Sequence, residues 1–199
     1  MGIGLYTYPT TKNDFLRRFV EGQMMMYEQK GQEVLGKGPS ILCLNQSGSM
    51  RNLDTQSKGF TLALMSIARR QRRDFCLILF STRIQVFKYE KGKIKCSDMV
   101  KLAQSFLSGG TDFSLPLTKT LSVINESRFK QADVVFVTDC EDRLRDSFLE
   151  EFKKKKKEKA FNVLSLVIGS SINRVTQFSD IVVKIKDFDE KGSFTAFEI

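Results

Sequence analysis

The chain has 199 residues, of which 41% are hydrophobic and 28% are charged, and these values exclude a disordered chain and fit one globular domain with a real core. It contains no histidine, which excludes every mechanism that needs an imidazole base, including Ser-His-Asp and Cys-His chemistry. The formal net charge of +9 favours an acidic partner: nucleic acid, a membrane surface or an acidic protein face.

The apolar runs and the cysteines indicate the cellular compartment of the protein. No apolar run approaches the roughly 20 residues that span a bilayer, and the first residues lack the charged and apolar blocks of a signal peptide. No C-x-x-C pair occurs among the four cysteines, Cys43, Cys76, Cys96 and Cys140. We therefore expect neither a disulfide framework nor a zinc site, and a reduced, cytoplasmic protein.

Three segments are expected along the chain. Residues 1–37 form an N-terminal extension with one helix from about Asp14 to Gln32, where apolar residues recur at near-helical spacing. Residues 38–186 form the main domain, and residues 187–199 form a C-terminal tail. Because the first helix precedes the first strand, the chain could also be a fragment of a larger protein.

The most informative stretch follows Pro39. Residues 41–44 form a short apolar run that predicts a buried strand, and Asn45, Ser47 and Ser49 follow it on alternate positions. A tight turn aims every second side chain into the same space, and two hydroxyls and an amide oxygen suit a hard cation such as Mg²⁺. The alternative is that these side chains only hydrogen-bond the turn and cap the helix expected over residues 54–73.

The rest of the pattern predicts an alternating series of strands and helices. We expect strands over residues 75–80, 84–89, 132–138, 161–168 and 181–185, and helices over residues 97–106, 114–126, 145–159 and 172–178. The second and third strands are too close in sequence for a parallel crossover, so the third strand pairs antiparallel at the sheet edge. We predict an α/β fold with a doubly wound, Rossmann-like, six-stranded and mostly parallel sheet of order 3-2-1-4-5-6, with helices on both faces.

Two further oxygen-bearing residues stand where this topology brings loops together. Thr111 follows Gly109-Gly110, where the backbone can turn sharply, and Asp139 follows the fourth strand. In the predicted order the first and fourth strands flank the switch crevice, where open α/β sheets bind ligands. The sequence therefore predicts that Thr111 and Asp139 lie near Asn45, Ser47 and Ser49.

These residues resemble the metal-ion-dependent adhesion site of von Willebrand factor A (VWA) domains, which begins with D-x-S-x-S. The resemblance implies that Ser47, Ser49 and Thr111 bind Mg²⁺, or Mn²⁺ or Ca²⁺, directly, and that Asn45 and Asp139 act largely through bound waters. It implies recognition of an Asp or Glu from a partner protein at an open position of the ion, with no bond broken.

The chain departs from the family pattern at Asn45, where the family has aspartate, so one negative charge is missing. Coulomb attraction between a carboxylate and a divalent ion one water molecule away is worth on the order of a few kcal/mol at an effective dielectric near 20. Three interpretations are possible: a loop that binds no metal, a loop that binds the ion weakly, or an engineered Asp→Asn change. We rank weak or absent metal above full affinity, and expect Asn45→Asp to raise the affinity for Mg²⁺.

The match is closest to one group of VWA proteins, the bacterial intracellular CoxE/ViaA-like group, over about residues 38–185. Residues 63–68, 79–82 and 106–112 carry this closer resemblance, besides residues 38–49. It implies a non-enzymatic adaptor for MoxR-type AAA+ ATPases in chaperone-like remodelling, with a client protein bound through an Asp or Glu.

The strongest charge feature is a run of five lysines, Lys153, Lys154, Lys155, Lys156 and Lys157. A solvated helix end is the plainer interpretation, because cations are favourable near a helix C-terminus. The run could also be a basic partner surface. The alternative function is therefore a basic VWA domain that binds nucleic acid, RNA in particular.

Overall fold

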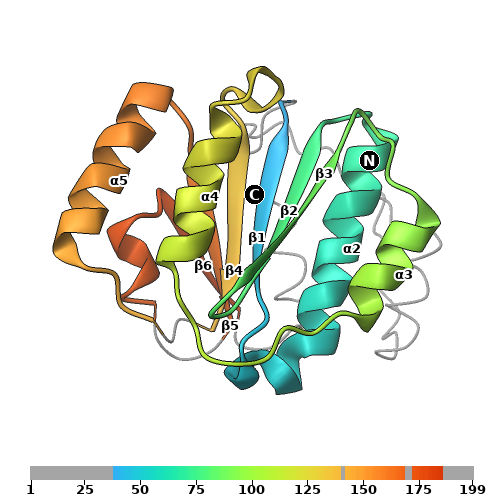
Figure 1. Cartoon of the computed structure of the whole chain (residues 1–199), viewed down its shortest axis with the longest axis horizontal. Helices are drawn as coiled ribbons and strands as arrows, with labels where there is room; N and C mark the ends of the chain where they lie inside the picture. Colours follow the sequence, from blue (N-terminus) through green and yellow to red (C-terminus); the bar gives the residue numbers. More distant parts are fainter. Residues whose placement is uncertain (1–37, 140–141, 169–171, 186–199) are drawn as a thin grey trace, which may run out of the picture. The chain divides into compact units, whose positions relative to one another are not determined.

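The computed structural model, shown in Figure 1, describes residues 38–139, 142–168 and 172–185. The chain divides into two units, residues 1–32 and 33–199, and every described residue belongs to the second. The helix expected over residues 14–32 and the tail over residues 187–199 lie outside the described residues.

One six-stranded sheet forms the centre of the described unit. Its strands are β1 (Ser40–Asn45), β2 (Phe75–Phe80), β3 (Ile84–Tyr89), β4 (Asp133–Thr138), β5 (Val163–Ile168) and β6 (Ile181–Ile185). Their spatial order is β3-β2-β1-β4-β5-β6, with β3 antiparallel to β2 and all other neighbours parallel. The predicted doubly wound topology is confirmed, including the antiparallel edge strand.

Helices cover both faces of this sheet. They are η1 (Gly48–Leu53), α2 (Asp54–Arg70), α3 (Cys96–Gln104), α4 (Ser114–Ile124), η2 (Ser127–Phe129), α5 (Asp146–Lys159) and η3 (Val175–Gln177), where η marks a short 3₁₀ helix. Figure 1 shows α2 beside α3 and α4 beside α5. Two apolar cores result, one between the sheet and α2–α3 and one between the sheet and α4–α5.

The core under α4 and α5 is rich in phenylalanine. Phe113 packs edge-to-face on Phe136 with ring centroids 5.2 Å apart, and Phe136 packs in the same way on Phe178. All three side chains are fully buried. Because Phe113 directly precedes α4, this packing fixes the start of that helix and the loop that leads into it.

The expected bounds of two helices are wrong, and local hydrogen bonds explain the end of the first and the start of the second. The helix expected over residues 54–73 ends at Arg70, because Arg72 adopts a left-handed conformation (φ 53°) and the Arg73 N–H bonds back to the Ala68 carbonyl. The helix expected over residues 97–106 begins at Cys96, since Asp98 Oδ2 accepts the Lys95 N–H at 2.9 Å, and ends at Gln104.

The helix expected over residues 172–178 is also wrong, since only the single turn η3 forms there. This stretch is too short to sustain a helix without tertiary support on most of its positions. The other elements match their expected ranges within one or two residues at the ends. No helix among the described residues has the length and apolar character to cross a membrane.

Candidate functional site

The carboxyl end of β1 carries the first part of the candidate site. The side chains of Asn45, Gln46 and Ser47 are buried to 99% or more, whereas Ser49 is exposed. The polar residues at the end of the strand are thus buried, and the chain is exposed at Gly48 and Ser49. Buried polar groups at a strand end need partners, so their hydrogen bonds define the site.

Asn45 connects the end of β1 to the end of β4. Its Oδ1 accepts the Ser47 N–H at 2.9 Å, while its Nδ2 donates to Thr138 Oγ1 at 3.1 Å and to Asp139 Oδ1 at 3.0 Å. The amide oxygen and both amide hydrogens are therefore used. The structure brings Asn45 and Asp139 into direct contact, as the predicted strand order requires.

The two serines of the motif face each other across the turn. Ser47 Oγ and Ser49 Oγ are 2.9 Å apart, and one is buried while the other is exposed. Ser47 precedes η1 but makes no side-chain capping bond to it. The capping part of the alternative is therefore wrong for Ser47, whereas its other part, hydrogen bonding within the turn, describes the contacts of Asn45, Ser47 and Ser49. The two hydroxyl oxygens lie together at the surface end of the turn.

The end of α3 and the loop that follows it, residues 103–109, lie along the carboxyl edge of the strands; we call this stretch the edge segment (Figure 1). Every second carbonyl accepts a hydrogen bond from the body of the domain. The pairs are Lys58 Nζ to Ala103 O (3.1 Å), Gln46 Nε2 to Ser105 O (3.3 Å), Arg83 Nη2 to Leu107 O (3.2 Å) and Gly48 N to Gly109 O (2.7 Å). Four donors from three regions of the sequence therefore hold this segment in place.

Thr111 is positioned by its neighbours on both sides. Gly109 has φ +91° and its carbonyl is bound to Gly48, while the Asp112 N–H donates to Ser81 O at 3.1 Å. Asp112 Oδ1 then accepts the Ser114 N–H at 2.8 Å, which fixes the turn into α4. Half-buried Thr111 thus follows a segment that touches the serine turn through the Gly48–Gly109 bond.

The five predicted site residues come from three loops at one edge of the sheet. Asn45 with Asp139 and Ser47 with Ser49 are in direct contact, and Thr111 is linked through the Gly48–Gly109 hydrogen bond. In the described part of the chain, no cluster of three or more His, Cys, Asp or Glu side chains could hold a metal. A cation here would depend on hydroxyl oxygens and a single carboxylate.

This donor set fits a weakly held hard cation. Hydroxyl and carboxylate oxygens are what Mg²⁺ takes, and it keeps several waters. Asn45 turns its N–H groups, not an oxygen, toward Asp139, so it supplies no charge on that side. Ser47, Ser49 and Thr111 would hold such an ion, and Asp139 would place a carboxylate beside it.

Sequence reasoning missed the residues that hold the edge segment. Lys58 is buried, donates to Asp54 Oδ2 at 2.6 Å as well as to Ala103, and lies 5.8 Å from the Phe106 ring centroid. Arg51 stands over the same ring at 5.3 Å. The only signal in the sequence was Lys58 four residues after Asp54 in a predicted helix, which is ordinary for a surface ion pair.

The lysine run lies on α5, and two of its members are engaged. Lys155 pairs with Glu151, and Lys156 Nζ donates to Asp180 Oδ1 at 2.7 Å and to Phe178 O at 3.0 Å. Lys156 is half-buried. Lys153, Lys154 and Lys157 are exposed, so the plainer interpretation of a solvated helix end suits them.

Known proteins similar in sequence include an uncharacterized protein of Methanocaldococcus jannaschii, 32% identical over 182 residues, or 89% of this chain and 42% of that protein. The regulatory protein ViaA of Photorhabdus laumondii is 32% identical over 162 residues, or 70% of this chain and 32% of that protein. The chain thus spans between a third and a half of the length of these relatives. No family model matches the chain.

Solved structures with the same fold include a von Willebrand factor type A protein of Catenulispora acidiphila, with a TM-score of 0.59 at 14% identity over 81% of this chain and 40% of that chain. A second is the mussel byssus proximal thread matrix protein 1, described with a zinc-occupied metal-ion-dependent adhesion motif. Its TM-score is 0.62 at 18% identity, over 84% of this chain and 48% of that chain. At these identities the likeness concerns the fold.

Proposed function

The chain is a von Willebrand factor A domain protein similar to the ViaA regulatory proteins, and we propose that it is a non-enzymatic module that binds an acidic side chain of a partner protein. The contact is made at the carboxyl edge of the sheet through a weakly held Mg²⁺ ion. Ser47, Ser49 and Thr111 bind the ion, and Asp139 stands beside them.

The observation that supports this most is the meeting of three loops. The turn after β1 contacts the Gly109–Thr111 loop through the 2.7 Å Gly48–Gly109 bond and contacts the end of β4 through the 3.0 Å Asn45–Asp139 bond. Hydroxyls from two loops and a carboxylate from a third therefore share one edge, which is what a hydroxyl-rich cation site requires.

The charge balance at the site supports a role of the ion in recognising an acidic side chain of a partner protein. A divalent cation beside one carboxylate keeps a net positive charge, because Asn45 is neutral. A partner's Asp or Glu supplies the second negative charge, so the ion and the partner's acid stabilise each other. We therefore propose that ion and partner bind together, each weakly alone.

The partner is proposed to be a MoxR-type AAA+ ATPase, with this chain as the adaptor that brings it a client protein. The ViaA-like resemblance and the regulatory name of those relatives support this role. The absence of histidine from all 199 residues supports a non-catalytic one, because no imidazole base is available.

Co-purification with the ATPase tests the proposal. The native chain, the Thr111→Ala variant and a Ser66→Ala control, which removes an exposed hydroxyl on α2, are each mixed with a MoxR-type ATPase of the same genome. We expect retention of the native and control proteins in MgCl₂, and loss on Thr111→Ala or on chelation with EDTA. Equal retention of all three in EDTA would contradict the proposal.

A further inference from the structure

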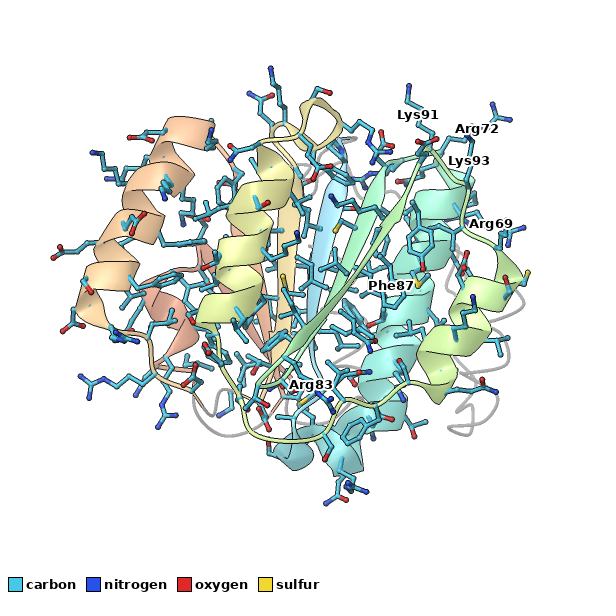
Figure 2. All side chains as sticks on the ribbon, in the orientation of Figure 1. Arg69, Arg72, Arg83, Phe87, Lys91 and Lys93 are labelled. Carbon is cyan, nitrogen blue, oxygen red and sulfur yellow. The ribbon has the colours of Figure 1, made fainter. Side chains whose placement is uncertain are left out.

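The end of α2 and the turn between β3 and α3 gather five exposed cations, which we call the amino-edge patch: Arg69, Arg70, Arg72, Lys91 and Lys93. The three arginines are close together in the sequence, and the fold adds the two lysines from about 20 residues further on. Figure 2 shows Arg69, Arg72, Lys91 and Lys93 projecting outward at the same end of the molecule, far from Arg83.

The turn is fixed tightly against the helix end. Gly92 N donates to Arg73 O at 3.2 Å, and Lys91 N donates to Asp74 Oδ1 at the same distance. Gly92 has φ +77°, and a Cβ there would stand 2.8 Å from the Arg69 carbonyl oxygen. Only glycine fits such an approach, so Lys91 and Lys93, on either side of it, are held beside the arginines.

Few acidic groups neutralise this patch. Glu90 is shared between Lys93 (3.0 Å) and Arg128 (3.1 Å). Arg69 contacts the Cys96 sulfur at 3.7 Å, and among residues 38–139, 142–168 and 172–185 no ion pair joins Arg69, Arg72 or Lys91 to an acid. The patch therefore keeps a net positive charge on a well-fixed backbone, with Glu90 and Asp74 offsetting part of it.

The patch and the candidate cation site occupy opposite edges of the sheet. α2 starts after η1, which follows the serine turn, and its 17 residues run to Arg70, which corresponds to about 25 Å of helix. Arg73 confirms the location, since its side chain donates to Gly38 O just before β1 and pairs with Asp133 at the start of β4. Two partners could thus be bound at once.

We propose that the amino-edge patch is a second docking surface, which binds an acidic protein surface independently of the candidate cation site. Nucleic acid fits it less well, because single strands need exposed aromatic rings for stacking. The nearest aromatic side chains, Phe87 and Tyr89, are half-buried against the α2–α3 core. A compact group of five cations also gives no long track for a phosphate backbone, but it matches an acidic patch on a protein.

The test uses two probes, a labelled peptide of alternating glutamate and serine and a single-stranded RNA of equal charge, each titrated with the full chain by fluorescence anisotropy at low and at physiological salt. The patch variant is Arg69→Glu/Arg72→Glu/Lys91→Glu. The matched control is Lys153→Glu/Lys154→Glu/Lys157→Glu on α5, which changes the net charge equally at exposed positions. A milder variant with Gln at the three patch positions serves if the Glu variant does not fold.

We expect the peptide to bind, more weakly as salt rises, and the patch variant to lose about tenfold or more in affinity while the control stays within about threefold. Equal losses in the two variants would mean that net charge alone attracts the peptide, and would overturn the proposal. Tighter binding of the RNA than of the peptide, or no binding of the peptide at low salt, would overturn it as well.

Discussion

The Asn45 side-chain amide donates a 3.0 Å hydrogen bond to Asp139 Oδ1 and so joins the end of β1 directly to the end of β4. At this position the VWA motif has an aspartate, whose carboxylate would face Asp139 with like charge. The amide replaces repulsion by a bond in a fully buried position. We therefore expect the loop arrangement of the native chain to be independent of a cation.

The Asn45→Asp substitution should make the arrangement of these two loops depend on a bound cation. Without divalent ions the variant loses two donated hydrogen bonds and sets two carboxylates together, so the free energy of unfolding should fall by roughly 1–3 kcal/mol. MgCl₂ should restore much of this stability, and calorimetry should show a higher affinity for Mg²⁺ than in the native chain. Asn45→Ala is the control, because it removes the donors without adding charge. Equal Mg²⁺ affinities of native and Asp variants would refute this prediction.

Lys58→Met should loosen the edge segment. Lys58 is only 8% exposed and holds both Asp54 and the Ala103 carbonyl, so its removal takes a charged donor away from two partly exposed acceptors and leaves a buried gap. We expect a loss of roughly 1–3 kcal/mol in urea denaturation. The matched control is Lys101→Met on α3, whose exposed side chain should change stability by less than about 0.5 kcal/mol. Similar losses in the two variants would show that Lys58 does not anchor the segment.

Gly92→Ala should destabilise the turn that carries Lys91 and Lys93. The added Cβ meets the Arg69 carbonyl oxygen at 2.8 Å in a left-handed backbone, which should cost roughly 1–3 kcal/mol. Gly38→Ala is the comparison, since its Cβ would find its nearest neighbour at 3.7 Å. Thermal denaturation compares the stabilities of the two variants. If Gly92→Ala were as stable as Gly38→Ala, the close approach of Gly92 to the Arg69 carbonyl would be contradicted.

The thiols should differ sharply in reactivity. Burial raises the pKa of Cys43 and of Cys76 to about 12, whereas Cys96 is exposed. Iodoacetamide near pH 8 should therefore label Cys96 quickly and leave Cys43 and Cys76 unmodified until the protein unfolds. Peptide mapping by mass spectrometry measures this, and early labelling of Cys43 in the native protein would refute it.

The same shifts predict alkaline destabilisation. The unfolded thiols ionise near pH 9 while the folded ones stay neutral to about pH 12, so their contribution to stability is full below pH 9 and is lost as the pH rises toward 12. Urea midpoints should fall across that window, and by less in a Cys76→Ser variant.

The sheet order was predictable because the strands other than β3 are mostly apolar runs of five or six residues, and because only residues 81–83 separate β2 from β3. That short link forces antiparallel pairing, and the remaining right-handed crossovers leave one order. The proximity of Asn45 to Asp139 then followed from topology alone.

The edge segment was not predictable from local pattern. Phe106 and Leu107 continue the apolar period of α3, so the sequence predicts helix there, whereas the structure has an extended segment. Its carbonyls are bound by Lys58, Gln46 and Arg83, which come from distant elements. A tertiary interaction of this kind overrides local propensity and leaves no trace in the segment's own sequence.

The most direct test of cation-dependent acid recognition follows the backbone amide signals of Gly48, Gly109 and Gly110 by NMR while acetyl-aspartate is added. We predict that the acid shifts these signals only when Mg²⁺ is present, that Thr111→Ala abolishes the response, and that Ser66→Ala keeps it. Equal shifts in MgCl₂ and in EDTA, or no shift at these glycines under either condition, would contradict the account.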